Sequence, residues 1–189
     1  MPRYDVQRYG RKRGASNVSQ KVYDEWYHTA NKSNGTMTNW ARGSRWEQNV
    51  LVGGGYAGGE NEIPRIGNAM SVDSTTGYWT FPHTGLYKIE FNLRHYKPVD
   101  NDFAATNIYF RSGTTDYQLT KAYFIVEHEG EHFMLSNRIF VDISNTSTQA
   151  VYFENAAFGS TSNYVTGSST QNTNSSKVSF ERIGDSPSV

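Results

Sequence analysis

A strict alternation of apolar and polar side chains between residues 86 and 96 constrains the fold more than any other feature. The apolar positions are Tyr87, Ile89, Phe91 and Leu93, and Lys88, Glu90, Asn92 and Arg94 lie between them. A period of two is that of a strand with one face buried and the other in water. The pattern therefore predicts a strand that contributes one face to a core.

A second alternation runs from Phe133 to Ile143, with Leu135, Ile139 and Val141 on the same face. Shorter strands are predicted at residues 108–111, 117–127, 150–154 and 178–183. Between these segments lie runs rich in Gly, Ser, Thr and Asn, which favour turns. Many short strands without intervening helical patterns predict an all-β sandwich or barrel.

Charge divides the chain into two parts. Residues 1–48 hold 9 of the 18 Lys and Arg but only 4 of the 18 Asp and Glu, so they carry +5 and the remainder carries −5. We interpret residues 1–48 as a basic N-terminal arm and residues 49–189 as the folded domain. Two readings of the arm stay open: a solvated tail, or an arm that docks on an acidic surface.

Within the arm, residues 19–29 carry apolar side chains at helical spacing, which predicts a short helix that is stable only when packed. Large aromatic side chains and a cluster of arginines make the arm suited to anchoring. The predicted anchoring residues are Tyr4, Arg8, Arg11, Arg13, Trp26, Trp40 and Trp46.

Residues 71–93 read SVDSTTGYWTFPHTGLYKIEFNL, in which Gly77 follows a polar turn, Pro82 ends an aromatic strand and Gly85 opens the next. This segment resembles the hallmark of the jelly-roll superfamily of complement globular heads (C-one-q type) and tumour necrosis factor. The segments VYFENAAFG and KVSFERIG are similar to the last two strands of that family. The resemblance covers residues 50–184.

The resemblance implies a jelly-roll β-sandwich of about ten short antiparallel strands. Members of the family usually form compact trimers, which implies apolar side chains on the face away from the core. Phe124, Val126, Met134 and Phe140 have the opposite parity to their core-facing neighbours and are the candidates for subunit contacts. The alternative is that the arm covers this face.

Chemical motifs are few. The chain has no Cys, which excludes disulfides and thiolate metal sites. Gly53, Gly55 and Gly58 match G-x-G-x-x-G, but GENEIP follows instead of a helix that could hold a pyrophosphate. The segment EHEGEH supplies only weak metal candidates, His128, Glu129 and His132, because an acidic turn is usually just solvated.

No nucleophile elbow or P-loop is present, and no carboxylate pair stands out, so we expect neither catalysis nor a cofactor. No stretch is apolar enough to suggest a membrane span. Arginines interleaved with tyrosines near the N-terminus are compatible with nucleic-acid contact. We favour protein docking for them, because the rest of the chain is acidic.

Jelly-roll heads similar to this family also occur in bacteria and in phage particles, as fibre tips, knobs and capsid decorations. Together with the absence of Cys, the resemblance therefore implies a structural protein of a bacteriophage virion. We expect a homotrimeric knob that decorates or cements the capsid, with the major capsid or tail proteins of the same particle as partners. The alternative is a tail-fibre component or a receptor-binding head that binds a host surface glycan. Its ligand residues would be Tyr56, Tyr164 and the loop 160–176.

Overall fold

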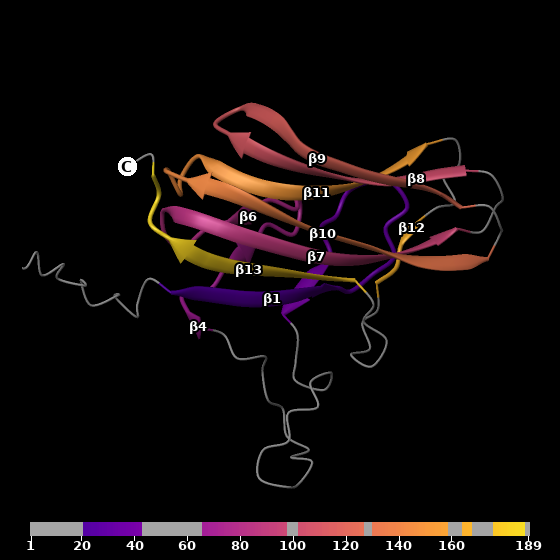
Figure 1. The fold of residues 1–189 in the computed structure, drawn as a ribbon, viewed down its shortest axis with the longest axis horizontal. Coiled ribbons are helices and arrows are strands. Elements are labelled where there is room, and N and C mark those ends of the chain that lie inside the picture. The colour runs from indigo at the N-terminus through magenta and orange to yellow at the C-terminus, as the bar shows by residue number, and fades with distance from the viewer. Residues whose placement is uncertain are drawn as a thin grey trace, which may run out of the picture.

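A computed structural model describes residues 21–42, 66–97, 102–126, 130–158, 164–167 and 176–187 (Figure 1). Within these ranges the chain forms thirteen β-strands and no helix. The strands are β1 (Val22–His28), β2 (Gly35–Thr36), β3 (Trp40–Arg42), β4 (Ile66–Gly67), β5 (Ser71–Val72), β6 (Trp79–Thr80), β7 (Gly85–Lys97), β8 (Asp102–Ser112), β9 (Thr115–Val126), β10 (Glu131–Ile143), β11 (Gln149–Phe158), β12 (Tyr164–Val165) and β13 (Lys177–Gly184). Among the described residues, then, no helix is available to cross a membrane.

The strands form two antiparallel sheets that lie one over the other (Figure 1). The seven-stranded sheet has the order β10-β7-β13-β1-β3, with β12 paired to β7 and β4 paired to β1. The six-stranded sheet has the order β5-β6-β11-β8-β9, with β2 paired to β11. The C-terminal strand β13 thus lies in the middle of its sheet, between the early strands β1 and β7.

The predicted strands are confirmed, and several are longer than predicted. The alternation at 86–96 belongs to β7, and its apolar positions are almost fully buried. β10 pairs with β7 over its whole length, so that Leu135 lies opposite Leu93 and Ile139 opposite Ile89. Gly85 has φ +150°, and a Cβ there would lie 2.6 Å from the Gly184 carbonyl oxygen, which explains the glycine at the entry to β7.

An aromatic cluster joins the two sheets at the centre of the core. Trp79 of β6 in the six-stranded sheet contacts Trp26 of β1 and Phe180 of β13 in the other sheet, at ring-centroid distances of 5.0 and 4.7 Å. Trp40 of β3 lies 5.6 Å from Trp79 and donates from Nε1 to the Met37 carbonyl oxygen. These buried rings fill the space between the two sheets.

The predicted helix at residues 19–29 is wrong, because residues 22–28 form strand β1. Val22, Asp24, Trp26 and His28 point into the core, and β1 pairs with β13 on one side and with β3 and β4 on the other. A short apolar run fits the period of a helix as well as that of a strand. Here the pairing with β13 stabilises the strand. The sandwich therefore includes residues 22–42, which the charge pattern predicts to be part of the arm.

Asp24 is a buried carboxylate held by groups from two other segments. It accepts from the Met70 backbone N–H at 2.9 Å and lies 3.3 Å from Arg42 Nε. Arg42 also donates to the Met70 carbonyl oxygen and lies 4.7 Å from the centroid of the Trp26 ring. Burial raises the pKa of Asp24, and Arg42 acts in the opposite direction. This arrangement ties β1, β3 and the segment before β5 together.

Replacing Asp24 with alanine is expected to lower the free energy of unfolding by about 2–3 kcal/mol, because the change leaves a buried N–H and a charged Arg42 without their acceptor. The measurement is urea unfolding followed by circular dichroism. Asp185→Ala is the matched control, since Asp185 also pairs with an arginine, Arg182, but its side chain is 89% exposed. We expect the control substitution to lower the free energy of unfolding by less than about 1 kcal/mol. Equal losses in the two variants would contradict the role assigned to Asp24.

Candidate functional site

The face of the seven-stranded sheet that points away from the core is the strongest candidate for a functional surface. Register places its outward side chains in rows that cross β1, β13, β7 and β10. One row is Glu25, Ser179, Glu90 and Arg138. The flanking rows are Tyr23, Glu181, Lys88 and Phe140 on one side, and Tyr27, Lys177, Asn92 and Ser136 on the other.

Charges on this face are paired between neighbouring strands. Glu90 lies 2.8 Å from Arg138 Nε and 3.5 Å from Lys88 Nζ. Lys88 also bonds Glu181, which raises the pKa of the lysine, and Lys177 lies 3.7 Å from Glu25. The middle of the face is thus polar but close to electrically neutral, because each carboxylate has a cationic neighbour.

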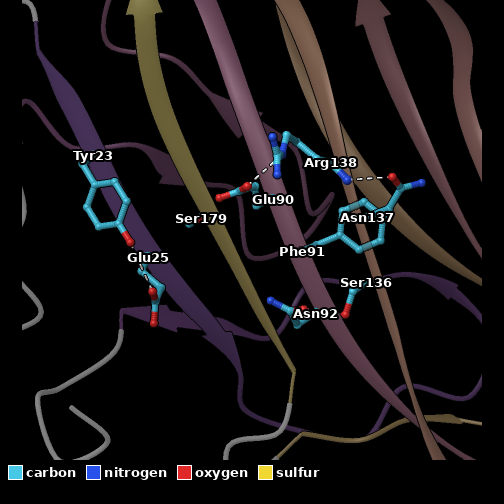
Figure 2. A pocket seen from close by; sticks show the side chains of 9 residues that line it. All are labelled: Tyr23, Glu25, Glu90, Phe91, Asn92, Ser136, Asn137, Arg138 and Ser179. Atoms are coloured by element: carbon cyan, nitrogen blue, oxygen red, sulfur yellow. Dashed lines mark hydrogen bonds and ion pairs between the residues drawn. The ribbon is translucent and has the colours of Figure 1, made fainter. Parts of the chain in front are cut away.

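A shallow cavity of about 660 Å³ lies over these rows. Figure 2 shows Glu90 and Arg138 reaching toward each other over β7 and β10, and Tyr23 extending toward Glu25 on β1. Burial, followed by the charge of Glu25, raises the pKa of Tyr23, so this hydroxyl stays protonated and can donate a hydrogen bond. The cavity offers donors and acceptors for another surface, but it contains no nucleophile held by a base.

Exposed large hydrophobic side chains border this polar area. Met134 and Phe140 of the edge strand β10 are 52% and 54% exposed, as their parity predicts. Ile66 of β4 lies across from Tyr23 at the opposite edge. Ile183 is exposed at the irregularity between Arg182 and Gly184. The role of Met134 and Phe140 in subunit contacts stays a prediction.

At the far end of the same face, β12 takes the place of β13 beside β7. Tyr164 of β12 and His132 of β10 both lie opposite Tyr96 of β7. The ring centroids of Tyr96 and His132 are 4.7 Å apart, and those of Tyr96 and Tyr164 are 5.1 Å apart. His132, a weak metal candidate, thus packs on a tyrosine. In the described part of the chain no group of three His, Asp or Glu could hold a metal.

Two of the predicted anchoring residues belong to the core instead. Trp26 and Trp40 are about nine-tenths buried within their own sandwich, so they do not face a partner. Other predicted residues lie outside the described residues: Tyr4, Arg8, Arg11, Arg13, Trp46, Tyr56, His128 and Glu129. Phe124 and Val126 fall in β9, but their side chains are likewise outside the description.

The sequence did not single out Arg94 and Tyr96, two side chains that the structure places on this face. The alternation in β7 already predicts that Arg94 lies on the solvent-facing side of the strand. The pattern of a single strand does not show which side chains of other strands lie beside Arg94. Only the pairing of β7 with both β10 and β12 brings Tyr96 between the rings of His132 and Tyr164, with Arg94 in the neighbouring row.

The comparisons with known proteins bear on the fold. No family model matches the chain, and no curated protein matches it. Among solved structures, 125 chains match. The Eiger TNF from S. frugiperda superposes with a TM-score of 0.54 over 88% of this chain and 94% of that chain, at 8% identity. This chain has a tumour necrosis factor-like jelly-roll fold. At so low an identity, the likeness to the TNF structure concerns the fold alone.

Proposed function

We propose that this chain is an assembling structural protein of a bacteriophage virion, built as a homotrimeric knob that decorates the capsid. The observation that carries the proposal is the pair of exposed side chains Met134 and Phe140 on an edge strand, beside a polar face whose charges are already matched. Exposed apolar side chains next to satisfied polar groups are typical of surfaces that bury against protein.

Contact between copies suits this face better than a small substrate does. Its cavity is shallow and its charges are paired across strands, so a flat protein surface can cover it without leaving charges unpaired. A TNF-like jelly roll provides a rigid scaffold for such a face. The resemblance to trimeric family members supports three copies around one axis, with Met134 and Phe140 as contact residues.

Attachment to the particle is assigned mainly to the residues that precede β1. With Trp26 and Trp40 in the core, the proposed anchor consists of residues 1–20 and Trp46, and residues 1–20 hold five Lys and Arg against one Asp. Tyr4, Arg8, Arg11 and Arg13 are its candidate contacts with an acidic shell surface. Cryo-electron microscopy of the intact particle tests this assignment: density for the knob on the capsid supports it, and density only at the tail tip contradicts it.

Self-association is tested by light scattering of the purified chain. We expect a mass of three times the 21.4 kDa chain for the wild type. Phe140→Asp together with Met134→Ser should give a folded monomer, because a buried unpaired carboxylate opposes the contact. Tyr117→Ser is the matched control, since Tyr117 is also 54% exposed but lies on β9 of the other sheet. A monomeric wild type, or a double variant that stays trimeric, contradicts the proposal.

A further inference from the structure

A cationic and aromatic patch lies at the end of the seven-stranded sheet where β12 pairs with β7. Register arranges it as two rows on one face: Tyr164, Tyr96 and His132, and beside them Thr166 and Arg94, with Met134 of the proposed subunit contact opposite Arg94 at the border of the patch. Strands lie about 4.8 Å apart, so the three rings form a strip roughly 10 Å long. Tyr96 and Tyr164 are half-buried and His132 is exposed, so the strip is open to solvent.

Arg94 is distinctive because it has no carboxylate partner among the described residues. The other cations of this face, Lys88, Arg138 and Lys177, each pair with a glutamate. Burial, and then the charge of Arg94, lower the pKa of His132, so the imidazole is neutral near pH 7. Arg94 therefore supplies the positive charge that the rows of this patch carry.

We infer that this patch binds a carboxylated saccharide, with Arg94 pairing with the sugar carboxylate and the rings of Tyr96, Tyr164 and His132 packing on the apolar faces of the sugar rings. The guanidinium group is planar and binds a carboxylate through two parallel hydrogen bonds. Tyrosine rings combine an apolar face with a hydroxyl that bonds sugar hydroxyls.

The ring geometry favours a saccharide over an acidic peptide. Interplanar angles of 45° and 39° tilt the outer rings relative to Tyr96, so the three rings contact one another without stacking in parallel. Burial, and then Tyr96, raise the pKa of Tyr164, which keeps its hydroxyl protonated as a donor. A peptide held by such a strip would need additional backbone partners, whereas a saccharide needs only ring faces and hydroxyl partners. The inference goes beyond assembly, since it assigns a ligand to an area next to the proposed contact face.

The test is binding of immobilised saccharides by the full chain, with 3′-sialyllactose and hyaluronan oligosaccharides as carboxylated probes and lactose as the neutral one. We expect the wild type to bind a carboxylated probe and not lactose. Arg94→Gln should weaken binding about tenfold or more. Arg94→Lys should retain part of the binding, because lysine keeps the positive charge but lacks the two parallel N–H donors of the guanidinium group. Tyr164→Ala should also weaken binding, and Tyr164→Phe less so.

Arg111→Gln is the matched control, because Arg111 lies on the six-stranded sheet and pairs with Asp116. Its saccharide binding should equal that of the wild type. Three results would overturn the inference: no binding of any carboxylated probe, binding that Arg94→Gln leaves unchanged, or Arg94-dependent binding of a poly-glutamate peptide alone. A change of oligomeric mass in Arg94→Gln would also overturn it, by placing the patch inside the subunit contact instead.

Discussion

Lowering the pH from 7 to 5 is expected to reduce the free energy of unfolding by several kcal/mol, through two imidazoles in the core. His28 of β1 and His95 of β7 are both 0% exposed. Burial lowers the pKa of each to about 4, and for His28 Lys32 adds to the effect. The ring of His28 packs at 4.9 Å on Trp40, and neither of its nitrogens has a hydrogen-bond partner among the residues that the structure describes. A proton on His28 would therefore be a buried charge that no described neighbour balances.

The direction of this change in stability follows from proton uptake by the unfolded chain. In the unfolded chain both histidines regain an ordinary pKa near 6.5, so between about pH 6.5 and 4 the unfolded state binds protons that the folded state does not. The two histidines therefore leave the free energy of unfolding at its full value above about pH 6.5. The free energy of unfolding falls as the pH is lowered through this window. Each imidazole contributes about 2 kcal/mol of the loss at pH 5. Asp24, whose pKa is raised by burial, opposes the trend as the pH falls from its raised pKa toward the ordinary value of about 4.

Urea unfolding at pH 7 and pH 5 measures the effect. His28→Leu should reduce the difference between the two pH values by about 2 kcal/mol, because it removes one of the two titrating groups. The two pH values are compared within each variant. A change in packing caused by His28→Leu affects stability equally at both pH values and therefore cancels from the difference. His83→Gln is the control, since His83 is half-exposed and hydrogen-bonds Asn68 at the surface. An unchanged pH difference in His28→Leu would contradict the assignment.

Removing the ring of Trp79 is expected to lower the free energy of unfolding by about 3–5 kcal/mol. This loss is among the largest expected from any single substitution in this core. Trp79 is fully buried and contacts Trp26, Trp40 and Phe180, so its ring bridges the two sheets. Trp79→Ala leaves a cavity between sheets that the neighbouring rings are too rigid to fill. Since the sandwich has a free energy of unfolding of the order of 5–15 kcal/mol, much of that stability depends on one side chain.

Two further variants separate packing from other causes. Within the described part of the chain, Nε1 of Trp79 has no hydrogen-bond partner. Trp79→Phe therefore removes volume without breaking a hydrogen bond seen there, and it should lower the free energy of unfolding less than Trp79→Ala. Tyr117→Ala removes an aromatic ring that is 54% exposed and should cost under about 1 kcal/mol. Thermal and urea unfolding of the three variants test the ranking. A loss below about 1 kcal/mol for Trp79→Ala would show that the two sheets do not depend on this ring.

The local alternation of side chains decided much of the fold in advance. In β7 and β10 the period of two determines which side chains are buried, because neighbouring residues of a strand must point to opposite faces. Pro82 and Gly85 set the entry to β7 for equally local reasons, namely a missing donor and a permissive backbone. The exposure of Met134 and Phe140 followed from the same parity.

Strand order and the partners of each face were decided by the tertiary structure alone. Residues 22–28 carry an apolar pattern that fits a helix or a strand, and only pairing with β13, some 150 residues later, made them β1 and buried Trp26 and Trp40. The row of Tyr164, Tyr96 and His132 likewise comes from three segments distant in sequence. Side-chain parity is a property of each strand by itself, whereas the neighbours across a sheet depend on contacts that no local pattern records.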